Sequence, residues 1–308
     1  MTLTSISADR KRYFSGVLLA FGGAICFSLK AIQIKLAYRY HVDALALLTL
    51  RLLFALPFYV GIALYSNKRG SEQVRLTGGD WFGTAFFGMS GYYLASLLDF
   101  MGLQYVTAGL ERLVLFVYPT IVLLLSAIFL KKRIQGVQYL ALALTYLGMA
   151  IAFGEDVRRG GQKDLWLGTG LIFGSAVTYA VYMIGSGRLI PKLGTVRFTC
   201  YSMLFATLGI CLHFAFSRGI DSILHLEGQV YVYAFQIAIV STVVPSFMIS
   251  EGIQRIGSNN VSIIGTIGPI ATIVMAYYFL GEGVHFYQIV GTIMVIGGVM
   301  LVGLKGKS

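Results

Sequence analysis

The sequence predicts an all-α integral membrane protein of ten transmembrane helices, arranged as two inverted repeats of five helices each. Three observations lead to this fold class. First, 57% of the 308 residues are hydrophobic and only 12% are charged, whereas soluble domains carry roughly 25% charged residues. Second, the apolar residues gather in long runs separated by short polar segments. Third, the two halves of the chain resemble each other at an offset of 150 residues.

Ten apolar runs are long enough to cross a bilayer, whose hydrocarbon core needs about 20 residues of helix. Backbone groups in lipid must bond internally, so helices are the expected structure. The first run follows a basic segment, but we expect an uncleaved helix rather than a signal peptide, because the run is long and lacks a cleavage pattern. The predicted spans are 14–37, 44–65, 81–103, 107–130, 135–153, 166–189, 197–216, 231–250, 258–280 and 284–304.

The basic residues between the spans predict the orientation. With the N-terminus inside, the inner segments hold 15 Lys and Arg residues and the outer segments hold 6. Cytoplasmic loops carry such an excess, so we expect both termini in the cytoplasm and a plasma membrane of the bacterial inner-membrane type. The outer loop 154–165, with three basic residues, is a local exception. Because these loops explain the net charge of +11, no nucleic-acid partner is expected.

The internal repeat is clearest around two prolines. The segment GLQYVTAGLERLVLFVYP ends at Pro119 and aligns without gaps with GIQRIGSNNVSIIGTIGP, which ends at Pro269. The same register continues along both segments until Gly148 aligns with Gly298. Each half holds five predicted spans, which is an odd number. The second half must therefore enter the membrane from the opposite side, as in many secondary transporters. The predicted domains are an N-terminal segment 1–13 and the repeats 14–153 and 166–304.

These segments resemble the drug/metabolite transporter superfamily, specifically its EamA-like family of tandem five-helix repeats. The resemblance rests on LRLLFALP from Leu50 to Pro57, on GLQYVTAGLERLVLFVYPTIVLLLSAIFL, and on GIQRIGSNNVSIIGTIGPIATIVMAYYFLGE, which ends at Glu282. It covers nearly the whole chain and implies ten helices, cytoplasmic termini and transport of small metabolites, often export. The first half departs from the pattern, because LKKR stands where the second half has LGE.

Five ionisable residues lie inside predicted spans: Lys30, Arg51, Asp99, Glu111 and Arg112. Charges in the bilayer are costly, and they usually pair or face a water-filled cavity. All five fall in the outer half of the predicted topology, and the equivalent positions of the second half that we could align carry no charge. We therefore predict that they bind the substrate, with Glu111 and Asp99 as candidates for proton coupling. Three cations and two carboxylates suit a zwitterionic amino acid or a small organic anion.

Each of these charges also has a structural alternative. Arg51 can brace neighbouring helices, and Lys30 can extend toward the outer headgroups. Asp99 and Arg112 can form an ion pair across a tight helix hairpin that turns near residues 104–107.

Aromatic residues and prolines complete the candidate site. Tyr92 and Tyr182 are predicted to line the cavity with an apolar face and a hydroxyl group; packing against lipid or helices is the alternative. Pro119, Pro245 and Pro269 are predicted to kink helices at gating elements, because proline removes a backbone hydrogen bond. Plain helix curvature is the alternative for the prolines.

The sequence shows no pattern for catalysis or cofactor binding. The three cysteines lack CxxC spacing, the four histidines lack ligand spacing, and no Walker A or GxSxG motif occurs. We therefore expect no catalytic residue, no metal and no cofactor. The expected partners are a small-molecule substrate and the lipid bilayer, with proton coupling and the choice between monomer and homodimer left open.

The predicted function is a secondary transporter that exports small metabolites by alternating access, with amino acids or related amphiphilic carboxylates as substrates. One alternative is an importer of an organic anion or vitamin with the same fold. An alternative of another class is a non-transporting membrane enzyme or partner protein.

Overall fold

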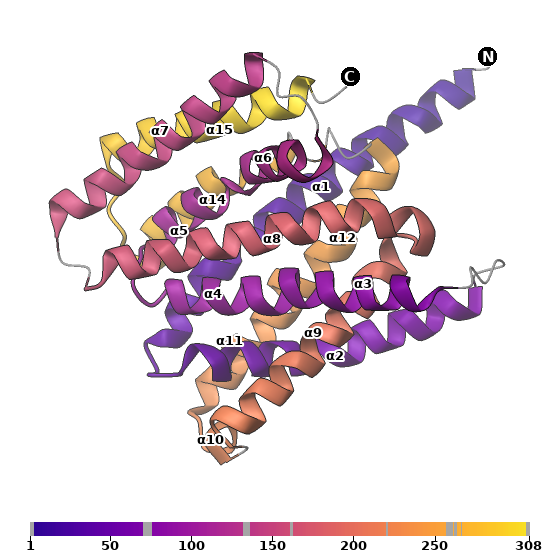
Figure 1. The fold of residues 1–308 in the computed structure, drawn as a ribbon, viewed down its shortest axis with the longest axis horizontal. Coiled ribbons are helices and arrows are strands. Elements are labelled where there is room, and N and C mark those ends of the chain that lie inside the picture. Colours follow the sequence, from indigo (N-terminus) through magenta and orange to yellow (C-terminus); the bar gives the residue numbers. More distant parts are fainter. Residues whose placement is uncertain are drawn as a thin grey trace.

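The computed structural model describes the backbone of residues 3–69, 76–131, 136–160, 163–219, 221–256, 261, 264–265 and 267–305. Every regular element in these ranges is helical, as the apolar runs predict. Figure 1 shows the helices packed in one bundle, with both ends of the chain emerging on the same side. The side chains of Arg10, Lys11 and Arg12, which helped to predict the orientation, lie outside the described residues.

The elements follow the chain in two sets. The first half holds α1 (Leu3–Tyr38), α2 (Ala44–Arg69), α3 (Gly78–Gly88), the π-helical turn η1 (Met89–Leu94), α4 (Ala95–Gly102), α5 (Ala108–Leu115), α6 (Tyr118–Leu130) and α7 (Gly136–Arg159). The second half holds α8 (Leu165–Leu193), α9 (Thr195–Ser217), α10 (Asp221–Leu224), α11 (Gly228–Ala238), η2 (Ile239–Val243), α12 (Val244–Ile256), α14 (Ile267–Met275), η3 (Ala276–Leu280) and α15 (Phe286–Lys305).

Seven helices in the described ranges are long and apolar enough to cross a membrane. The apolar helices Ile267–Leu280 and Phe286–Leu301 are shorter, and they occupy the ninth and tenth predicted spans. The third predicted span is a continuous helix from α3 through η1 to α4, but it is not among the seven. Its Gly, Ser, Tyr and Asp residues lower its hydropathy. The structure therefore establishes a multi-pass helical protein and not the predicted count of ten spans.

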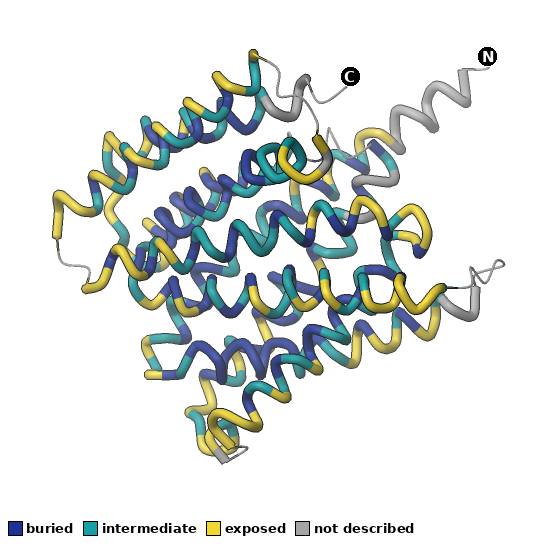
Figure 2. Tube along the Cα trace, viewed as in Figure 1, coloured by how far each residue is buried: buried dark blue, intermediate teal, exposed yellow. Residues whose placement is uncertain are grey.

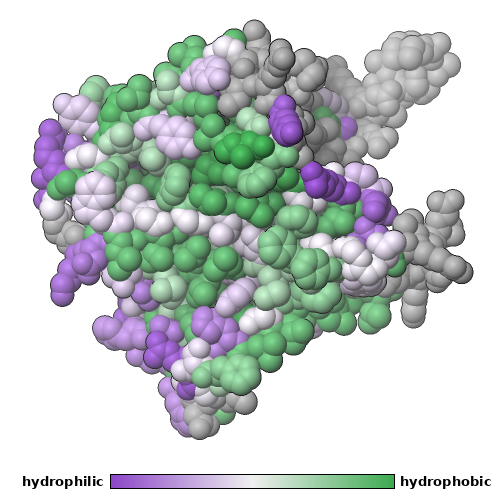
Figure 3. Space-filling model, viewed as in Figure 1, coloured by the Kyte–Doolittle hydropathy of each residue, from purple (hydrophilic) through white to green (hydrophobic). Residues whose placement is uncertain are grey.

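The outer surface of the bundle is apolar. Large hydrophobic side chains such as Phe82, Trp166, Phe216 and Tyr278 are more than 70% exposed. Figure 2 shows exposed residues along the outward faces of the helices, and Figure 3 shows hydrophobic side chains over most of the visible face, with hydrophilic ones gathered toward its edges. Soluble monomers rarely expose apolar patches of this extent, so this surface faces lipid.

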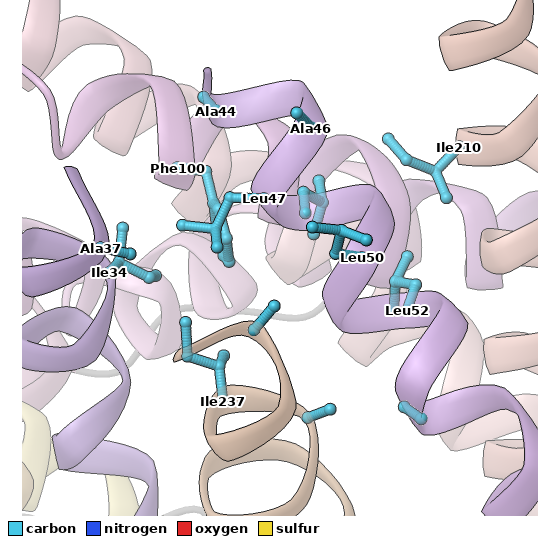
Figure 4. Close-up of a cluster of buried hydrophobic side chains, with 14 of the residues drawn as sticks. Ile34, Ala37, Ala44, Ala46, Leu47, Leu50, Leu52, Phe100, Ile210 and Ile237 are labelled. Carbon is cyan, nitrogen blue, oxygen red and sulfur yellow. The ribbon is translucent and has the colours of Figure 1, made fainter. Parts of the chain in front are cut away.

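The largest buried cluster joins both halves of the chain. It includes Leu47 and Leu52 of α2, Phe100 of α4, Ile210 of α9 and Ile237 of α11, and Figure 4 shows these side chains around α2. Leu47, Leu52 and Phe100 are fully buried. This cluster packs directly around the helices that carry the predicted charged residues.

Several helix irregularities repeat at the offset of 150 residues. The π-helical turns η1 and η2 begin at Met89 and Ile239. Lys131 and Gly281 end their helices in the left-handed conformation, with φ of 52° and 71°. Gly281 adopts this conformation without strain, whereas Lys131 carries a Cβ. The two halves thus share local backbone features as well as sequence.

The prolines lie beside helix interruptions. A turn at residues 116–117 separates α5 from α6, and Pro119 lies in the first turn of α6, where its missing N–H needs no partner. Pro269 is the third residue of α14 (Ile267–Met275), and Pro245 lies two residues after the end of η2. Pro119 therefore lies at the start of α6, directly after the interruption of the span Ala108–Phe129. The gating role of the three prolines stays a prediction.

Helices α7 and α15 pack so closely that their backbones are in contact. A Cβ on Gly148 would lie 2.7 Å from the carbonyl oxygen of Gly291, and a Cβ on Gly298 would lie 2.7 Å from that of Ala141. Moving back along α7 from Gly148 to Ala141 moves the contact forward along α15 from Gly291 to Gly298, so the helices are antiparallel. The two contacts are also equivalent under the repeat. Adding 150 to Gly148 gives Gly298, and subtracting 150 from Gly291 gives Ala141.

Adding a side chain at this contact tests the close packing. We expect Gly148→Val to destabilise the protein by at least about 1–3 kcal/mol, because the α15 backbone must move. The measurement is the free energy of unfolding in detergent. Gly154→Val, on the same helix, is the matched control, because nothing lies within 4 Å of its Cβ position. Equal effects of the two variants would contradict the close packing.

Candidate functional site

Three of the predicted charges meet in one buried group. Lys30 of α1 places its Nζ 2.5 Å from Oδ2 of Asp99 on α4 and 3.7 Å from Oε1 of Glu111 on α5. The side chain of Lys30 is 15% exposed, and those of Asp99 and Glu111 are 2% and 0% exposed. Lys30 therefore does not extend to the headgroups but points into the bundle. We call these three residues the charged triad.

The charged triad is electrically unbalanced. Two carboxylates share one ammonium group, so full ionisation leaves an excess negative charge. Oδ1 of Asp99 and both carboxylate oxygens of Glu111 have no hydrogen-bond partner among the described residues. Buried charges that lack partners are expensive. One bound proton, or one further cation, would balance the group.

The ion pair between Asp99 and Arg112, one of the structural alternatives, is not formed, because Asp99 pairs with Lys30 instead. Arg112 follows Glu111 on α5, about 100° further around the helix, and its guanidinium group lies against Gly268 of α14. Its buried Nε has no hydrogen-bond partner within the described ranges. Arg112 thus places a cation without a carboxylate between the first half and α14.

Arg51 of α2 forms no ion pair with a carboxylate of the described residues. Its Nε donates to Oγ1 of Thr242 in η2 at 3.0 Å, and a longer contact of 3.5 Å reaches the hydroxyl of Ser96. The guanidinium carbon lies 5.4 Å from the ring centre of Phe100, within the range of a cation–π interaction. Arg51 therefore ties α2 to the second half through η2, which agrees with the bracing alternative.

A row of tyrosines leads away from Arg112. The rings of Tyr118 and Tyr179 meet edge to face at 5.0 Å, and those of Tyr179 and Tyr182 lie 5.6 Å apart. The hydroxyl of Tyr182 donates to that of Tyr92 at 3.0 Å. Arg112 lies within electrostatic range of both Tyr118 and Tyr179. The structure thus brings Tyr92 and Tyr182 together and places Tyr179 and Tyr118 in the same row.

A surface hollow of about 590 Å³ lies next to the charged triad. It is lined by Lys35 and Tyr38 of α1, by residues of the α1–α2 connection, and by Leu103 and Gln104 of the hairpin before α5. Tyr38 belongs to this lining, and its hydroxyl donates to the carbonyl of Phe100 at 2.6 Å. Because Phe100 follows Asp99 in the chain, Tyr38 separates the hollow from the triad. The triad is therefore buried but close to an aqueous surface.

The hairpin before α5 is built as predicted, but one of its supports was missed. Thr107 caps α5 by accepting the N–H of Leu110 at 3.1 Å. In addition, the carboxylate of Glu282 accepts the N–H groups of Ala108 and Gly109 at 2.9 and 3.3 Å. Its place at the end of the LGE motif was the only signal in the sequence, and a loop carboxylate far along the chain could not be assigned to α5.

Polar side chains also link the two halves away from the triad. The hydroxyl of Ser241 in η2 donates to Oε1 of Gln33 at 2.6 Å, and that of Ser28 donates to the carbonyl of Gly268 at 3.1 Å. A π-helical turn leaves backbone groups open to side-chain bonding, and such turns are frequent at functional sites. The interface between the halves is therefore polar at the depth of the triad.

The fold and this site define a multi-pass helical membrane protein with a buried polar centre. The model of the EamA-like transporter family matches residues 14–154 and 166–304. The chain belongs to this family, which confirms the resemblance found in the sequence and indicates a membrane transporter.

Individual relatives agree with this membership. The chain is similar to the "Uncharacterized transporter YcbK" of Bacillus subtilis (strain 168), with 30% identity over 94% of this chain and 91% of that protein. The "Uncharacterized transporter YyaM" of the same organism is 23% identical over 78% of this chain and 77% of its own. A crystal structure of a protein shares the fold with a TM-score of 0.64, at 16% identity over 94% of this chain and 96% of the other.

Removing the shared cation tests the charged triad. We expect Lys30→Met to destabilise the protein by about 3–5 kcal/mol, because two buried carboxylates lose their partner. Adding Asp99→Asn should restore part of the loss, since one of the unpaired charges disappears as well. Unfolding free energies in detergent give the coupling energy of the pair.

The matched control is Lys192→Met, which removes the partner of Asp80. The side chain of Lys192 is 56% exposed, so this variant should cost no more than about 1 kcal/mol. If Lys30→Met costs the same with and without Asp99→Asn, the two side chains do not interact.

Proposed function

We propose that the protein is a secondary transporter that exports amino acids or related amphiphilic carboxylates by alternating access. The observation that carries this proposal is the combination of a buried, unbalanced charged triad with the adjacent guanidinium group of Arg112, which pairs with no carboxylate in the described part of the chain. A packed bundle has no structural need for such a group, because the second half of the chain carries Ile249 and Val261 where the first has Asp99 and Glu111. Ionisable residues in this setting usually belong to a transport pathway.

The proposed architecture is ten transmembrane helices in two inverted repeats. It is supported by the antiparallel contact of α7 with α15, whose residue pairs exchange at the offset of 150. The larger packing scheme agrees: α1 contacts α12 and α14, as α8 contacts α4 and α6, while α2 contacts α9. Exchanging the two halves turns the contacts of α1 into those of α8, and it leaves the contact of α2 with α9 unchanged. We place both termini in the cytoplasm and the protein in a plasma membrane.

Substrate recognition centres on Arg112 in this proposal. A guanidinium group binds a carboxylate through two parallel hydrogen bonds, and Arg112 has a free Nε for one of them. The neighbouring faces of Tyr118 and Tyr179 offer an apolar surface, and the hydroxyls of Tyr182 and Tyr92 a polar end. An amphiphilic carboxylate matches this sequence of groups better than a sugar or a metal ion.

Proton coupling is assigned to Glu111. One proton on the triad removes its excess charge, and Glu111 is the carboxylate farther from Lys30. Protonation of Glu111 would also change the field at Arg112, its neighbour in sequence. Because a proton on Glu111 removes a negative charge beside Arg112, the proton and the carboxylate substrate favour each other's binding at adjacent residues. This is a physical basis for coupling the movement of one to that of the other.

Two alternative functions are weighed against this one. An importer of an organic anion or vitamin would use the same Arg112 and differ in direction. A membrane enzyme would need a nucleophile with a base or a group of metal ligands, and the described residues contain no cluster of three potential His, Cys, Asp or Glu ligands. The relatives are named transporters, which favours transport over catalysis.

A thermal-shift screen against amino acids, small carboxylates and vitamins tests the proposal. A ligand that binds the folded state at 100 times its Kd stabilises it by about 2.7 kcal/mol. We expect a stabilising carboxylate whose effect is lost in Arg112→Gln and retained in Arg188→Gln, a control on the exposed face of α8. Stabilisation by carboxylates that persists unchanged in Arg112→Gln would contradict this site. The absence of any stabilising carboxylate would contradict the substrate class.

A further inference from the structure

Glu282 joins the two halves at the helix that carries Glu111 and Arg112. It lies in the connection between η3 and α15, directly after Gly281. Its two carboxylate oxygens accept the N–H groups of Ala108 and Gly109, 174 and 173 residues away in the chain. No other carboxylate in the described ranges accepts from the start of α5.

The physics of a helix terminus makes this contact favourable. The first N–H groups of a helix have no partner within the helix, and its N-terminus attracts negative charge. Thr107 satisfies only the N–H of Leu110, so Glu282 supplies the acceptors for the two preceding groups. Because Glu111 lies one turn further along α5, a movement of this helix start also moves Glu111 and Arg112.

The contact lies at one end of the interface between the halves. This is the end of the hollow beside the triad, lined by Lys35 and Gln104, and Lys35 is within electrostatic range of Glu282. At the opposite end the halves are tied by other contacts, namely Lys192 with Asp80 at 2.8 Å and Arg197 with the carbonyl of Ser66 at 3.2 Å. The halves are therefore linked by polar contacts at both ends in this structure.

We propose that Glu282 is the gating residue of the end that holds the hollow. Its hydrogen bonds to α5 hold that end closed, and they break when the cavity opens toward the hollow. Glu282 is half-buried at the surface, so water can replace both hydrogen bonds, and Lys35 offers the released carboxylate a second partner. The inference rests on the proposed alternating access and adds the residue that controls one of its two states.

Cysteine labelling tests the gate. Ser28 of α1 is 1% exposed and bonded to Gly268 of α14, so Ser28→Cys reports whether the halves have separated. The three native cysteines are replaced by alanine, and a membrane-impermeant maleimide is added to each side of sealed vesicles in turn. We expect Glu282→Gln to raise the labelling rate about fivefold or more from the side of the hollow, because the amide loses the charge and one acceptor.

Controls separate a gate from a loss of folding. Glu251→Gln removes a carboxylate that pairs within its own helix with Arg255, and its labelling should stay at the parent rate. If Glu282→Gln does not fold, Glu282→Asp is used with the same reporter, because its shorter carboxylate cannot reach both N–H groups. Unchanged labelling in the folded variant, or a rise only from the opposite side, would overturn the gate.

The same samples distinguish this failure from a failure of the proposed function. The thermal-shift response to the stabilising carboxylate is measured on Glu282→Gln as well. A retained response with unchanged labelling overturns the gate alone, whereas the proposed function fails in the ligand screen of the parent protein.

Discussion

The burial of two carboxylates against one ammonium group is the constraint on which the rest of this structure depends. Lys30, Asp99 and Glu111 come from three different helices, so α1, α4 and α5 must keep a fixed relation for the charges to stay paired. The surrounding contacts maintain that relation: Arg51 ties α2 to η2, Ser28 ties α1 to α14, and Glu282 fixes the start of α5. Contacts across the interface between the halves thus help to hold the buried charges of the triad in place.

This interface also explains why function and packing are hard to separate here. An ion pair in the bilayer stabilises the bundle only when every charge has a partner. The triad falls one positive charge short, and Arg112 forms no ion pair with a carboxylate of the described residues. A proton on the triad removes the first deficit and a carboxylate on Arg112 removes the second, so ligand binding changes the stability of the interface itself. The Glu282 contact with α5 lies one turn away and would respond to the same change.

Much of the fold could be predicted from hydropathy, because lipid allows few alternatives to long helices. The predicted span 44–65 became α2, and the predicted hairpin near 104–107 is present. The third span was harder, since its polar residues and glycines give it a low hydropathy. The π-helical turns were not predicted, because they depend on local hydrogen bonding and packing that residue types alone do not reveal.

The candidate site was predicted only in its composition. Residue types and depth identified Lys30, Asp99, Glu111 and Arg112, but not their pairing. The pairing depends on how each helix is rotated about its axis, and Lys30 lies 69 residues before Asp99 in the chain. For this reason Asp99 was assigned to Arg112, its neighbour in the hairpin, and not to Lys30. Glu282 was missed for the same reason, since its partners are backbone groups of a distant helix.

The most direct test of this account is transport in proteoliposomes, using the carboxylate that stabilises the purified protein. The account predicts that an imposed pH gradient drives the parent protein to move this carboxylate against its concentration gradient. Glu111→Gln should still exchange labelled for unlabelled substrate but should no longer respond to the pH gradient. Equal pH-driven accumulation by Glu111→Gln and the parent protein would contradict the central role given to the charged triad.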